Sequence, residues 1–339
     1  MDVTTVADDM IVLHDGTEVR RFEGLRPATA HILGGVAVRT LVRPPGELLA
    51  RFATVNDVHF GELECGMIEG VDGGPVMRPA DGEPPYPVTM NHGAVAEIRA
   101  IDPAVVIAKG DLTSSGTPNE YEQFLATYAA TFGDRLVHVR GNHDAYRGQS
   151  FAAGNRAVDL PGVRCLVLDT AWPQHTNGTL ERDSVAWLDD SIADAARSHL
   201  PVLVFGHHHI WNPASDFRDD GYFGLVPAAS EALISAFARH ANVLGYFAGH
   251  THRNRVVTVP ETGPLVYAEV ACVKDFPGTW AEYRIYEGGV MQVAHRVSTP
   301  EALAWSERCR ALYSDFGMDY ASYALGALGD RCFSLITAP

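Results

Sequence analysis

The sequence predicts a layered α/β domain in which helices cover two packed β-sheets, in the order αββα. Short apolar segments typical of strands alternate with helix-like segments from about residue 49 onward, and this alternation is typical of helices packed on a sheet. A β-rich run follows at residues 255–297 and predicts a second sheet packed against the first. With 46% hydrophobic and 20% charged residues among 339, the composition is that of a globular protein.

The first 48 residues predict a small β-appendage on this domain. Residues 10–14 and 17–22 are typical of strands, and they flank Asp15-Gly16, a turn signal because both positions accept a positive φ. A further β segment at 30–42 ends before Pro44-Pro45, a natural boundary. The segment is too short to form a complete β-sandwich of its own.

Residues 49–299 form the predicted main domain, and residues 300–339 a C-terminal helical extension. Strands are expected at 51–57, 104–111, 135–142, 163–170, 201–207 and 243–250. Helices are expected at 119–132, 184–197 and 230–241, and another at 93–101 would be capped by Asn91. The apolar positions of 300–328 can pack on the domain or on a second subunit, so a homo-oligomer stays open.

One long segment lacks a periodic pattern. Residues 60–90 are rich in Gly and Pro, and they directly follow a predicted strand that ends in polar residues. Long loops without regular structure in compact domains are usually functional or disordered. We expect this segment to cover a substrate cleft.

Charge and cysteine usage narrow the class of protein. The formal net charge is −16, and Lys and Arg form no stripe, which argues against binding to a nucleic-acid polymer. No stretch approaches the ~18 apolar residues that span a bilayer, and no secretory signal pattern is present, so no membrane partner is expected. Five scattered cysteines without C-x-x-C spacing indicate reduced thiols and a cytoplasmic location.

Five polar segments follow predicted strands, at the edge where α/β sheets bind ligands. They are Asp57-Val58-His59, Gly110-Asp111, Gly141-Asn142-His143-Asp144, His207-His208-His209 and Gly249-His250-Thr251-His252. Residues two apart in extended backbone project to the same side, so each D-x-H or H-x-H pair can converge on one centre. Mixed nitrogen and oxygen ligands suit Mn, Fe, Zn, Co or Ni and disfavour Ca²⁺. The set is too large for one metal ion and suits two, with one carboxylate shared.

In this order the motifs resemble those of the calcineurin-like metallophosphoesterases, whose signature runs D-x-H, G-D, G-N-H-[DE], a separate H and G-H-x-H. The match spans residues 57–252, most of the α/β domain. The fold is then a four-layer metallophosphoesterase sandwich. The resemblance assigns Asp57, His59 and His252 to a first metal ion and Asn142, His207 and His250 to a second, with Asp111 as the bridge. Analogy favours His207 as the ligand, and His208 is the alternative.

The centre that the resemblance implies is chemically consistent. Two divalent ions, two Asp carboxylates and a bridging hydroxide sum to a charge of about +1, which would attract a phosphate ester even inside an acidic protein. Coordination lowers the pKa of bound water to about 7 and so supplies a hydroxide nucleophile at neutral pH. The G-x-S-x-G motif of serine hydrolases is absent from the sequence.

His143 is not a metal ligand in the family pattern, where it points at the substrate. The resemblance therefore makes it the candidate catalytic residue. It would protonate the leaving alkoxide or stabilise charge in the transition state, and the alternative is that it orients a metal ligand. Asp144 is expected to be structural.

Departures from other branches of the family narrow the predicted reaction. Purple acid phosphatases place a metal-binding Tyr three residues after the bridging Asp, where this chain has Ser114, and the paired arginines of protein serine/threonine phosphatases are not evident beyond Arg147. The closest pattern is that of bacterial class III cyclic-nucleotide phosphodiesterases. We expect hydrolysis of small phosphodiesters, cyclic nucleotides among them. A phosphomonoesterase with the same centre is the alternative, and a non-catalytic scaffold is disfavoured because no expected ligand is missing.

Overall fold

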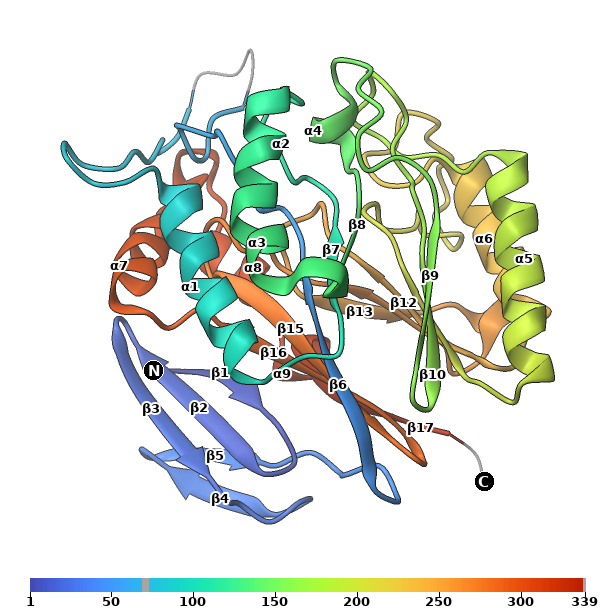
Figure 1. The fold of residues 1–339 in the computed structure, drawn as a ribbon. Coiled ribbons are helices and arrows are strands. Elements are labelled where there is room, and N and C mark those ends of the chain that lie inside the picture. The colour runs from blue at the N-terminus through green and yellow to red at the C-terminus, as the bar shows by residue number, and fades with distance from the viewer. Residues whose placement is uncertain (69–72, 338–339) are drawn as a thin grey trace.

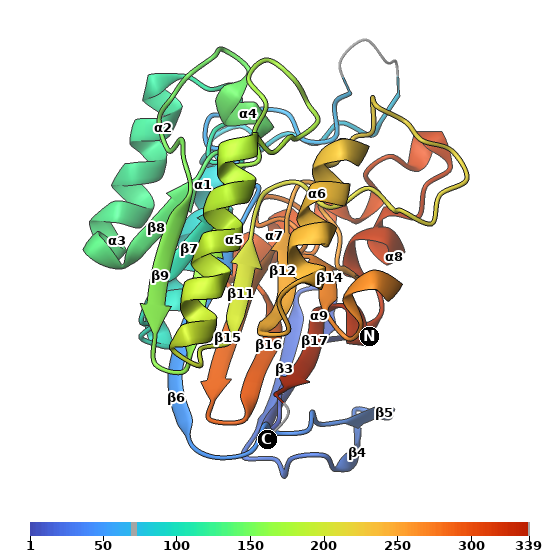
Figure 2. The ribbon, with the colours of Figure 1, turned by 90° about the vertical axis from the view of Figure 1, so that its right-hand side faces the viewer.

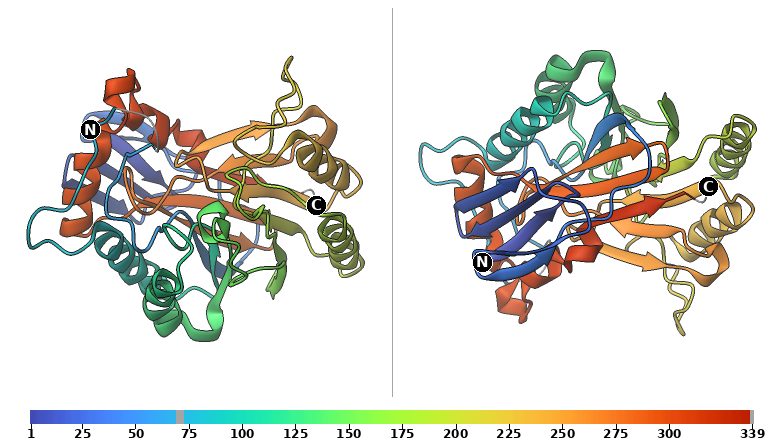
Figure 3. Two further views of the ribbon diagram at one scale, coloured as in Figure 1. Left: turned by 90° about the horizontal axis from the view of Figure 1, so that it is seen from above. Right: turned by 90° about the horizontal axis from the view of Figure 1, so that it is seen from below.

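The computed structural model describes residues 1–68 and 73–337 and contains two six-stranded sheets packed face to face (Figure 1). Buried aromatic side chains, Phe52, Phe205 and Phe247 among them, fill the space between the sheets. Helix α1 (Tyr86–Ala100) packs on the outer face of one sheet, and helices α5 (Arg182–Arg197) and α6 (Pro227–Ala238) pack on the outer face of the other (Figure 2, Figure 3). The predicted αββα order is confirmed.

The first sheet combines parallel strands from the start of the domain with antiparallel strands from its end. Its order is β17 (Cys332–Ile336), β16 (Gly289–Arg296), β15 (Thr279–Tyr286), β6 (Leu48–Val55), β7 (Val106–Lys109) and β8 (Leu136–Val139). Strands β6, β7 and β8 run parallel, whereas β15 pairs antiparallel with β6. Every residue of β7 is buried, as expected for a parallel strand covered on both faces.

The second sheet is also mixed. Its order is β13 (Arg255–Thr258), β14 (Val266–Glu269), β12 (Val243–Ala248), β11 (Val202–Phe205), β10 (Val163–Val167) and β9 (Arg156–Leu160). The four inner strands are parallel, and the two edge strands are antiparallel to their neighbours. Strand β9 was not predicted, because none of its residues is fully buried and no hydrophobic pattern marks it.

The prediction that the run at 255–297 forms the second sheet by itself is wrong. Strands β13 and β14 join β12 in the second sheet, whereas β15 and β16 join β6 in the first. Hydrophobic periodicity indicates that a strand forms, but the neighbour it pairs with depends on tertiary contacts that the pattern does not contain.

The helix after residue 85 begins earlier than predicted, and Asn91 has another role. Helix α1 begins at Tyr86 after Pro85, so Asn91 lies inside the helix and does not cap it. Its buried side-chain nitrogen donates to the Val58 carbonyl (2.9 Å), and its side-chain oxygen accepts from the Tyr128 hydroxyl (2.7 Å). Asn91 therefore ties α1 to the polar segment after β6.

The predicted helix at 119–132 is confirmed, but it is not α-helical throughout. It forms as α2 (Pro118–Phe124) and α3 (Ala130–Phe132), with a π-helical segment over Leu125–Ala129 between them. The Thr117 hydroxyl caps α2 by accepting a hydrogen bond from the backbone N–H of Glu120, and the Glu120 carboxylate accepts one from the backbone N–H of Thr117. This reciprocal capping box explains why the helix begins there.

The N-terminal β-appendage lies at the end of the molecule opposite to α4 (Asn142–Ala145) (Figure 1). Strands β1 (Asp2–Val6), β2 (Met10–Asp15) and β3 (Glu18–Glu23) form an antiparallel sheet, and β4 (Ala30–Leu33) pairs with β5 (Val36–Arg39). The appendage packs on β16, where the Thr5 hydroxyl donates to the Ala294 carbonyl (2.8 Å).

The C-terminal extension is only partly helical. Helices α7 (Pro300–Arg308), α8 (Tyr320–Leu325) and α9 (Leu328–Arg331) form, but strand β17 follows them and pairs antiparallel with β16. Helices form within the segment 300–328 as predicted, but the extension predicted over 300–339 is not helical throughout, because Cys332–Ile336 pairs with β16, a tertiary contact that the sequence pattern does not contain. The boundaries predicted at residues 48 and 299 stay predictions. No helix in the described ranges is long and apolar enough to cross a membrane.

Candidate metal centre

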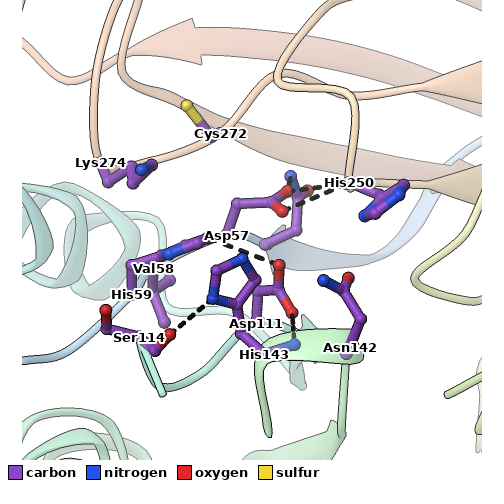
Figure 4. Close-up of polar contacts among 12 residues, drawn as sticks. Asp57, Val58, His59, Asp111, Ser114, Asn142, His143, His250, Cys272 and Lys274 are labelled. Atoms are coloured by element: carbon purple, nitrogen blue, oxygen red, sulfur yellow. Dashed lines mark hydrogen bonds and ion pairs between the residues drawn. The ribbon is translucent and has the colours of Figure 1, made fainter. Parts of the chain in front are cut away.

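The seven predicted metal ligands come together beyond the carboxyl ends of five parallel strands. Figure 4 labels five of them: Asp57, His59, Asp111, Asn142 and His250. Asp57 and His59 follow β6, Asp111 follows β7, Asn142 opens α4 after β8, His207 follows β11, and His250 and His252 follow β12. All are buried except His252, which is partly exposed. Parallel strands bring these residues to one place because their carboxyl ends share an edge.

Asp111 stands between two groups of side chains. Its Oδ2 lies 3.4 Å from Nε2 of His59 and 3.3 Å from Nε2 of His207. On one side, Asp57 Oδ1 lies 3.5 Å from Nε2 of His252. On the other side, Asn142 Oδ1 lies 3.0 Å from Nε2 of His207. The arrangement places one carboxylate where two centres can share it.

Two of the four imidazoles are backed by carboxylates, of which Asp275 is buried and Glu62 is partly exposed. Nδ1 of His59 lies 3.2 Å from Oε2 of Glu62, and Nδ1 of His252 lies 3.2 Å from Oδ2 of Asp275. Lys274 in turn donates to both carboxylate oxygens of Glu62, at 2.6 and 2.7 Å. Such partners fix the orientation of a metal-binding imidazole and raise its basicity.

The other two imidazoles are held by backbone carbonyls. Nδ1 of His207 lies 2.9 Å from the Lys109 oxygen, whereas His250 is reversed, with Nε2 2.8 Å from the Phe223 oxygen. Three of the four histidines thus leave Nε2 for the centre, and His250 leaves Nδ1. Oxygen acceptors on one nitrogen set the tautomer and keep the other nitrogen available.

Backbone strain is concentrated at the centre. Asp57, His59, Asp111, His250 and His252 have φ values of 50°, 47°, 49°, 70° and 54°. Left-handed backbone is uncommon for residues other than glycine and costs about 1–3 kcal/mol each. Hydrogen bonds between neighbouring strand ends hold it in place, such as Asp57 N to the Gly110 oxygen at 3.1 Å. Strain clustered in this way is typical of a functional site.

Glycines allow the strand ends to approach this closely. A Cβ on Gly110 would lie 2.7 Å from Nδ1 of His207 and 2.8 Å from Cα of Gly141. A Cβ on Gly249 would lie 2.7 Å from Oδ2 of Asp57. The glycines before the ligands are therefore required by close contact between segments.

The histidines keep the buried carboxylates ionised. Burial works to raise the pKa of Asp57, but the hydrogen bond and the charge of His252 outweigh it, and the pKa of Asp57 lies below its usual range. Burial likewise opposes ionisation of Asp111, and the charges of His207 and His143 hold the pKa of this carboxyl well below its usual range. The centre is a cluster of carboxylates that cations stabilise.

The donor atoms fit metal ions. Both ring nitrogens of His59 are buried without a hydrogen bond of good geometry, although buried polar atoms rarely lack a partner. Donor atoms of Asp57, His59 and His252 lie within 4.8 Å of one another, and so do those of Asp57, Asp111 and His207. Nitrogen and oxygen donors gathered in this way suit transition-metal ions.

The three consecutive histidines differ in their contacts. His208 engages both ring nitrogens, Nδ1 with the Thr170 hydroxyl (2.8 Å) and Nε2 with the Thr176 carbonyl (3.2 Å). It also lies with His207 and His250 in a group of donor atoms within 4.8 Å, but neither of its nitrogens is left over. His209 bonds the Tyr222 hydroxyl through Nε2 (2.8 Å).

His143 and Asp144 both lie at the start of α4 and differ in their surroundings. His143 is partly exposed and lines the cleft above the centre, and its Nδ1 lies 2.5 Å from the Ser114 carbonyl. Asp144 is fully buried and accepts hydrogen bonds from the backbone of Leu112, Thr113 and Gly141. Asp144 therefore organises the loops that carry Asp111 and Asn142.

An open cleft of about 1270 Å³ leads to the centre. Leu63, Met67 and Ile68 line it from the segment after β6, as expected for the predicted substrate loop. That loop ends earlier than predicted, because residues 86–90 belong to α1, and residues 69–72 lie outside the described residues.

Sequence reasoning missed several residues of the site. Glu62, Lys274 and Asp275 support the histidines from behind. Cys65, whose place a few residues after the D-x-H motif already made it a possible neighbour of the site, lies with its sulfur 3.8 Å from Oδ2 of Asp275. The segment after α7 lines the cleft with Tyr313, Met318, Tyr320 and Tyr323. Lys274-Asp275 follows a strand-like run, which is the one sequence signal that marks any of the missed residues.

Known proteins of similar sequence are phosphoesterases. A model of the calcineurin-like phosphoesterase family matches residues 50–254. The chain is 28% identical over 182 residues to a cAMP/cGMP dual specificity phosphodiesterase of Mycobacterium tuberculosis, which covers 50% of this chain and 55% of that protein. It is 27% identical over 163 residues to a glycerophosphodiester phosphodiesterase of Enterobacter lignolyticus, with 44% and 56% covered. A serine/threonine-protein phosphatase of Homo sapiens is 27% identical over 180 residues, with 52% and 50% covered.

The chain spans little more than half the length of the curated relatives it matches. Two solved structures share its fold. A dimetal phosphatase from Danio rerio superposes with a TM-score of 0.58 and 17% identity, over 74% of this chain and 97% of that one. A purple acid phosphatase from yellow lupin seeds superposes with a TM-score of 0.52 and 13% identity, over 83% and 60%.

Proposed function

Because the chain belongs to the calcineurin-like phosphoesterase family, we propose that it is a metal-dependent hydrolase of phosphate esters that acts on small phosphodiesters, cyclic nucleotides among them. The observation that carries the proposal is Asp111, whose Oδ2 lies within 3.4 Å of ring nitrogens from two separate groups of side chains. A carboxylate in that position can be shared by two metal ions. Relatives named as phosphodiesterases support the substrate class.

Under this proposal the centre holds two ions of the Mn, Fe, Zn, Co or Ni class. Asp57, His59 and His252 would hold one, and Asn142, His207 and His250 the other, with Asp111 shared. Such ions, when bound, polarise a phosphoryl group and lower the pKa of a water molecule to about 7. In each imidazole, one ring nitrogen contacts an oxygen atom of the protein. The protein thereby orients the other ring nitrogen toward the metal ions.

We assign to His143 the role of the acid that protonates the leaving group. Its Nδ1–H donates to the Ser114 carbonyl (2.5 Å), so Nε2 is the atom that would take up a proton in the cleft and, as the imidazolium, pass it to the leaving alkoxide. Its backbone N–H donates to Oδ1 of Asp111 (2.9 Å), which holds the start of α4 against the shared carboxylate. The ring lines the cleft, which supports a role toward the substrate.

The charges of the cleft favour a diester over a monoester. A monoester carries up to two negative charges at neutral pH, because the second pKa of a phosphate group is about 6, whereas a diester carries one. Among the described lining residues, the Lys and Arg side chains are Arg147 and Lys274, and Lys274 is held by Glu62. The cleft thus adds little positive charge of its own. A phosphomonoesterase is the second candidate, because one relative is named as a protein phosphatase.

Two nitrophenyl esters test the reaction. We expect the metal-loaded protein to hydrolyse bis(p-nitrophenyl) phosphate with a higher kcat/KM than p-nitrophenyl phosphate, and chelation to abolish activity until Mn²⁺ or Co²⁺ is restored. A higher kcat/KM for the monoester would favour the second candidate. Hydrolysis of neither ester would contradict the hydrolase.

Asp111→Asn tests the shared carboxylate. It removes one negative charge from between the two ions, so we expect lower metal content by elemental analysis as well as lower turnover. Two ions per chain with normal turnover in this variant would contradict the assignment of Asp111.

The setting of the reaction is part of the proposal. All five cysteines are buried as free thiols, which supports a reducing cytoplasmic location. A net charge of −16 supports a small substrate over a nucleic-acid polymer.

A further inference from the structure

Phe223 lies beside the candidate metal centre, on the segment that joins β11 to α6. Its carbonyl accepts the hydrogen bond from Nε2 of His250 (2.8 Å), and its ring stacks on the His250 imidazole, with 4.0 Å between the ring centroids and 27° between the planes. Yet Phe223 is 49% exposed and lines the cleft. One face of the phenyl ring covers a predicted ligand, and the rest of the ring is open to the cleft.

The backbone around Phe223 is closely held. Gly224 passes so near His209 that a Cβ would lie 2.4 Å from the His209 carbonyl oxygen. The Gly224 carbonyl accepts from Gly178 N (2.9 Å), and Leu225 N donates to the His209 carbonyl (2.8 Å). The phenyl ring is therefore presented at a defined place next to the centre.

Apolar side chains form part of the walls of the same cleft. Leu63 and Met67 are 69% and 60% exposed and line the same cleft, as do Tyr313 and Met318 from the C-terminal segment. The Nε of Arg147 is engaged by the Ser115 carbonyl (2.8 Å). A volume of about 1270 Å³ leaves room for much more than a phosphate group. The walls suit an uncharged substituent better than a second ionic group.

We propose that Phe223 determines substrate specificity by stacking with a flat, uncharged ring that the phosphate ester carries on the His250 side of the centre. A nucleobase and an aryl group share this chemistry. The inference rests on the proposed function and narrows it to esters whose alcohol bears such a ring. Offset stacking of aromatic rings increases affinity roughly 2- to 12-fold beyond the area that they bury.

The two roles of Phe223 can be separated by substitution. The carbonyl that holds His250 belongs to the backbone, so Phe223→Ala keeps it and removes only the ring. Phe223→Tyr keeps the ring. Phe217 provides a matched control, because it lies on the same segment, is 74% exposed and is not among the described residues that line the cleft.

Calorimetric binding of two simple monoesters to the metal-loaded protein tests the proposal. Phenyl phosphate and methyl phosphate differ only in the ring. We expect wild type, Phe217→Ala and Phe223→Tyr to prefer phenyl phosphate by roughly 2- to 12-fold. Phe223→Ala should bring the ratio of the two dissociation constants near one, with the affinity for methyl phosphate and the metal content unchanged. With bis(p-nitrophenyl) phosphate, it should raise KM and leave kcat unchanged.

Three results would overturn the inference. A wild type without preference for phenyl phosphate has no ring site, and a preference that survives in Phe223→Ala places the ring elsewhere. Equal loss of both ligands together with lost metal would show that Phe223 acts only through His250. Failure of the proposed function would give a different result. A wild type that hydrolyses no ester but binds phenyl phosphate more tightly than methyl phosphate would support the ring site and contradict the hydrolase.

Discussion

At the residue scale, the directions of the His207 and His208 side chains distinguish which of the two can be a metal ligand. His207 turns Nε2 toward Asn142 and Asp111, at 3.0 and 3.3 Å, while His208 turns away to the Thr170 hydroxyl and the Thr176 carbonyl. The chain bends at residues 207–208, and the two rings stand at 88° to each other, so one faces the centre and the other faces Thr170 and Thr176. The geometry supports His207 as the ligand.

Alanine substitutions separate these two histidines. We expect His207→Ala to deplete one of the two ions by elemental analysis with the other retained. His208→Ala should keep the metal content but lower the free energy of unfolding by about 1–3 kcal/mol, because the buried Thr170 hydroxyl loses its hydrogen bond to the ring. The reverse pattern would move the ligand to His208, and unchanged metal content in both variants would contradict the second metal position.

The role of His143 is tested by a series of leaving groups. If its Nε2 protonates the departing alkoxide, His143→Ala should slow esters of high-pKa alcohols far more than nitrophenyl esters, within the ~10²–10⁴-fold that general acid catalysis contributes. Nitrophenolate leaves without a proton, so its loss should be small. An equal loss across the series at full metal occupancy would indicate charge stabilisation instead, and loss of metal would indicate that the ring orients a ligand.

At the scale of elements, helix α1 supports the loop that carries two predicted ligands. The buried Asn91 side chain donates to the Val58 carbonyl (2.9 Å) and to the Pro87 carbonyl (2.7 Å), and it accepts from the Tyr128 hydroxyl (2.7 Å). Val58 lies between Asp57 and His59. A single side chain thus connects the packing of two helices to the position of the centre.

Removal of this side chain should therefore affect stability and metal binding together. We expect Asn91→Ala to lower the free energy of unfolding of the metal-free protein by about 1–3 kcal/mol, since buried donors and acceptors lose partners, and to weaken metal affinity. Tyr128→Phe removes one of the three hydrogen bonds and should cost less. Urea unfolding and metal titration measure the two effects, and normal metal affinity in Asn91→Ala would contradict the link to the loop.

At the scale of the whole molecule, a buried ionic network joins the N-terminal appendage to the first sheet. Arg284 of β15 donates to Asp8 and Asp9, at 2.8 Å each, and to Glu282 at 2.9 Å. Glu282 also lies 3.0 Å from Nε2 of His295. Burial works to raise the pKa of Glu282, but His295 and Arg284 outweigh it and lower this pKa to about 2.

This network predicts acid sensitivity. The pKa of Glu282 is lower in the folded protein than its ordinary value, so the unfolded chain binds more protons as pH falls. The stabilisation is fully present above about pH 4.5 and is lost toward pH 2, with a total of roughly 3 kcal/mol. Urea unfolding of metal-free wild type and Glu282→Gln at pH 6 and pH 3 measures it. The variant should lose less stability on acidification, and an equal loss would contradict the role of Glu282.

Much of the α/β framework could be predicted because each inner strand is a short apolar run between turn residues. Strands β10, β11 and β12 lie within their predicted ranges. Elements that lack such a pattern were missed: β9 has no fully buried residue, and β17 follows a helical segment directly. The pairing partners of the strands could not be predicted either. The alternation of apolar and polar residues that marks β14 and β15 does not indicate that they belong to different sheets.

By itself, the sequence determined the family and which residues meet: D-x-H, G-D, G-N-H, H and G-H-x-H each follow a buried strand, and parallel strands end at one edge. Only the tertiary structure decided how they meet. Which nitrogen of His250 is left for the centre depends on the Phe223 carbonyl, and the carboxylate behind His252 comes from Asp275, beyond β14. The cleft walls come from segments before β7 and after α7. These contacts join residues far apart along the chain, and side-chain direction there is set by packing that no local pattern encodes.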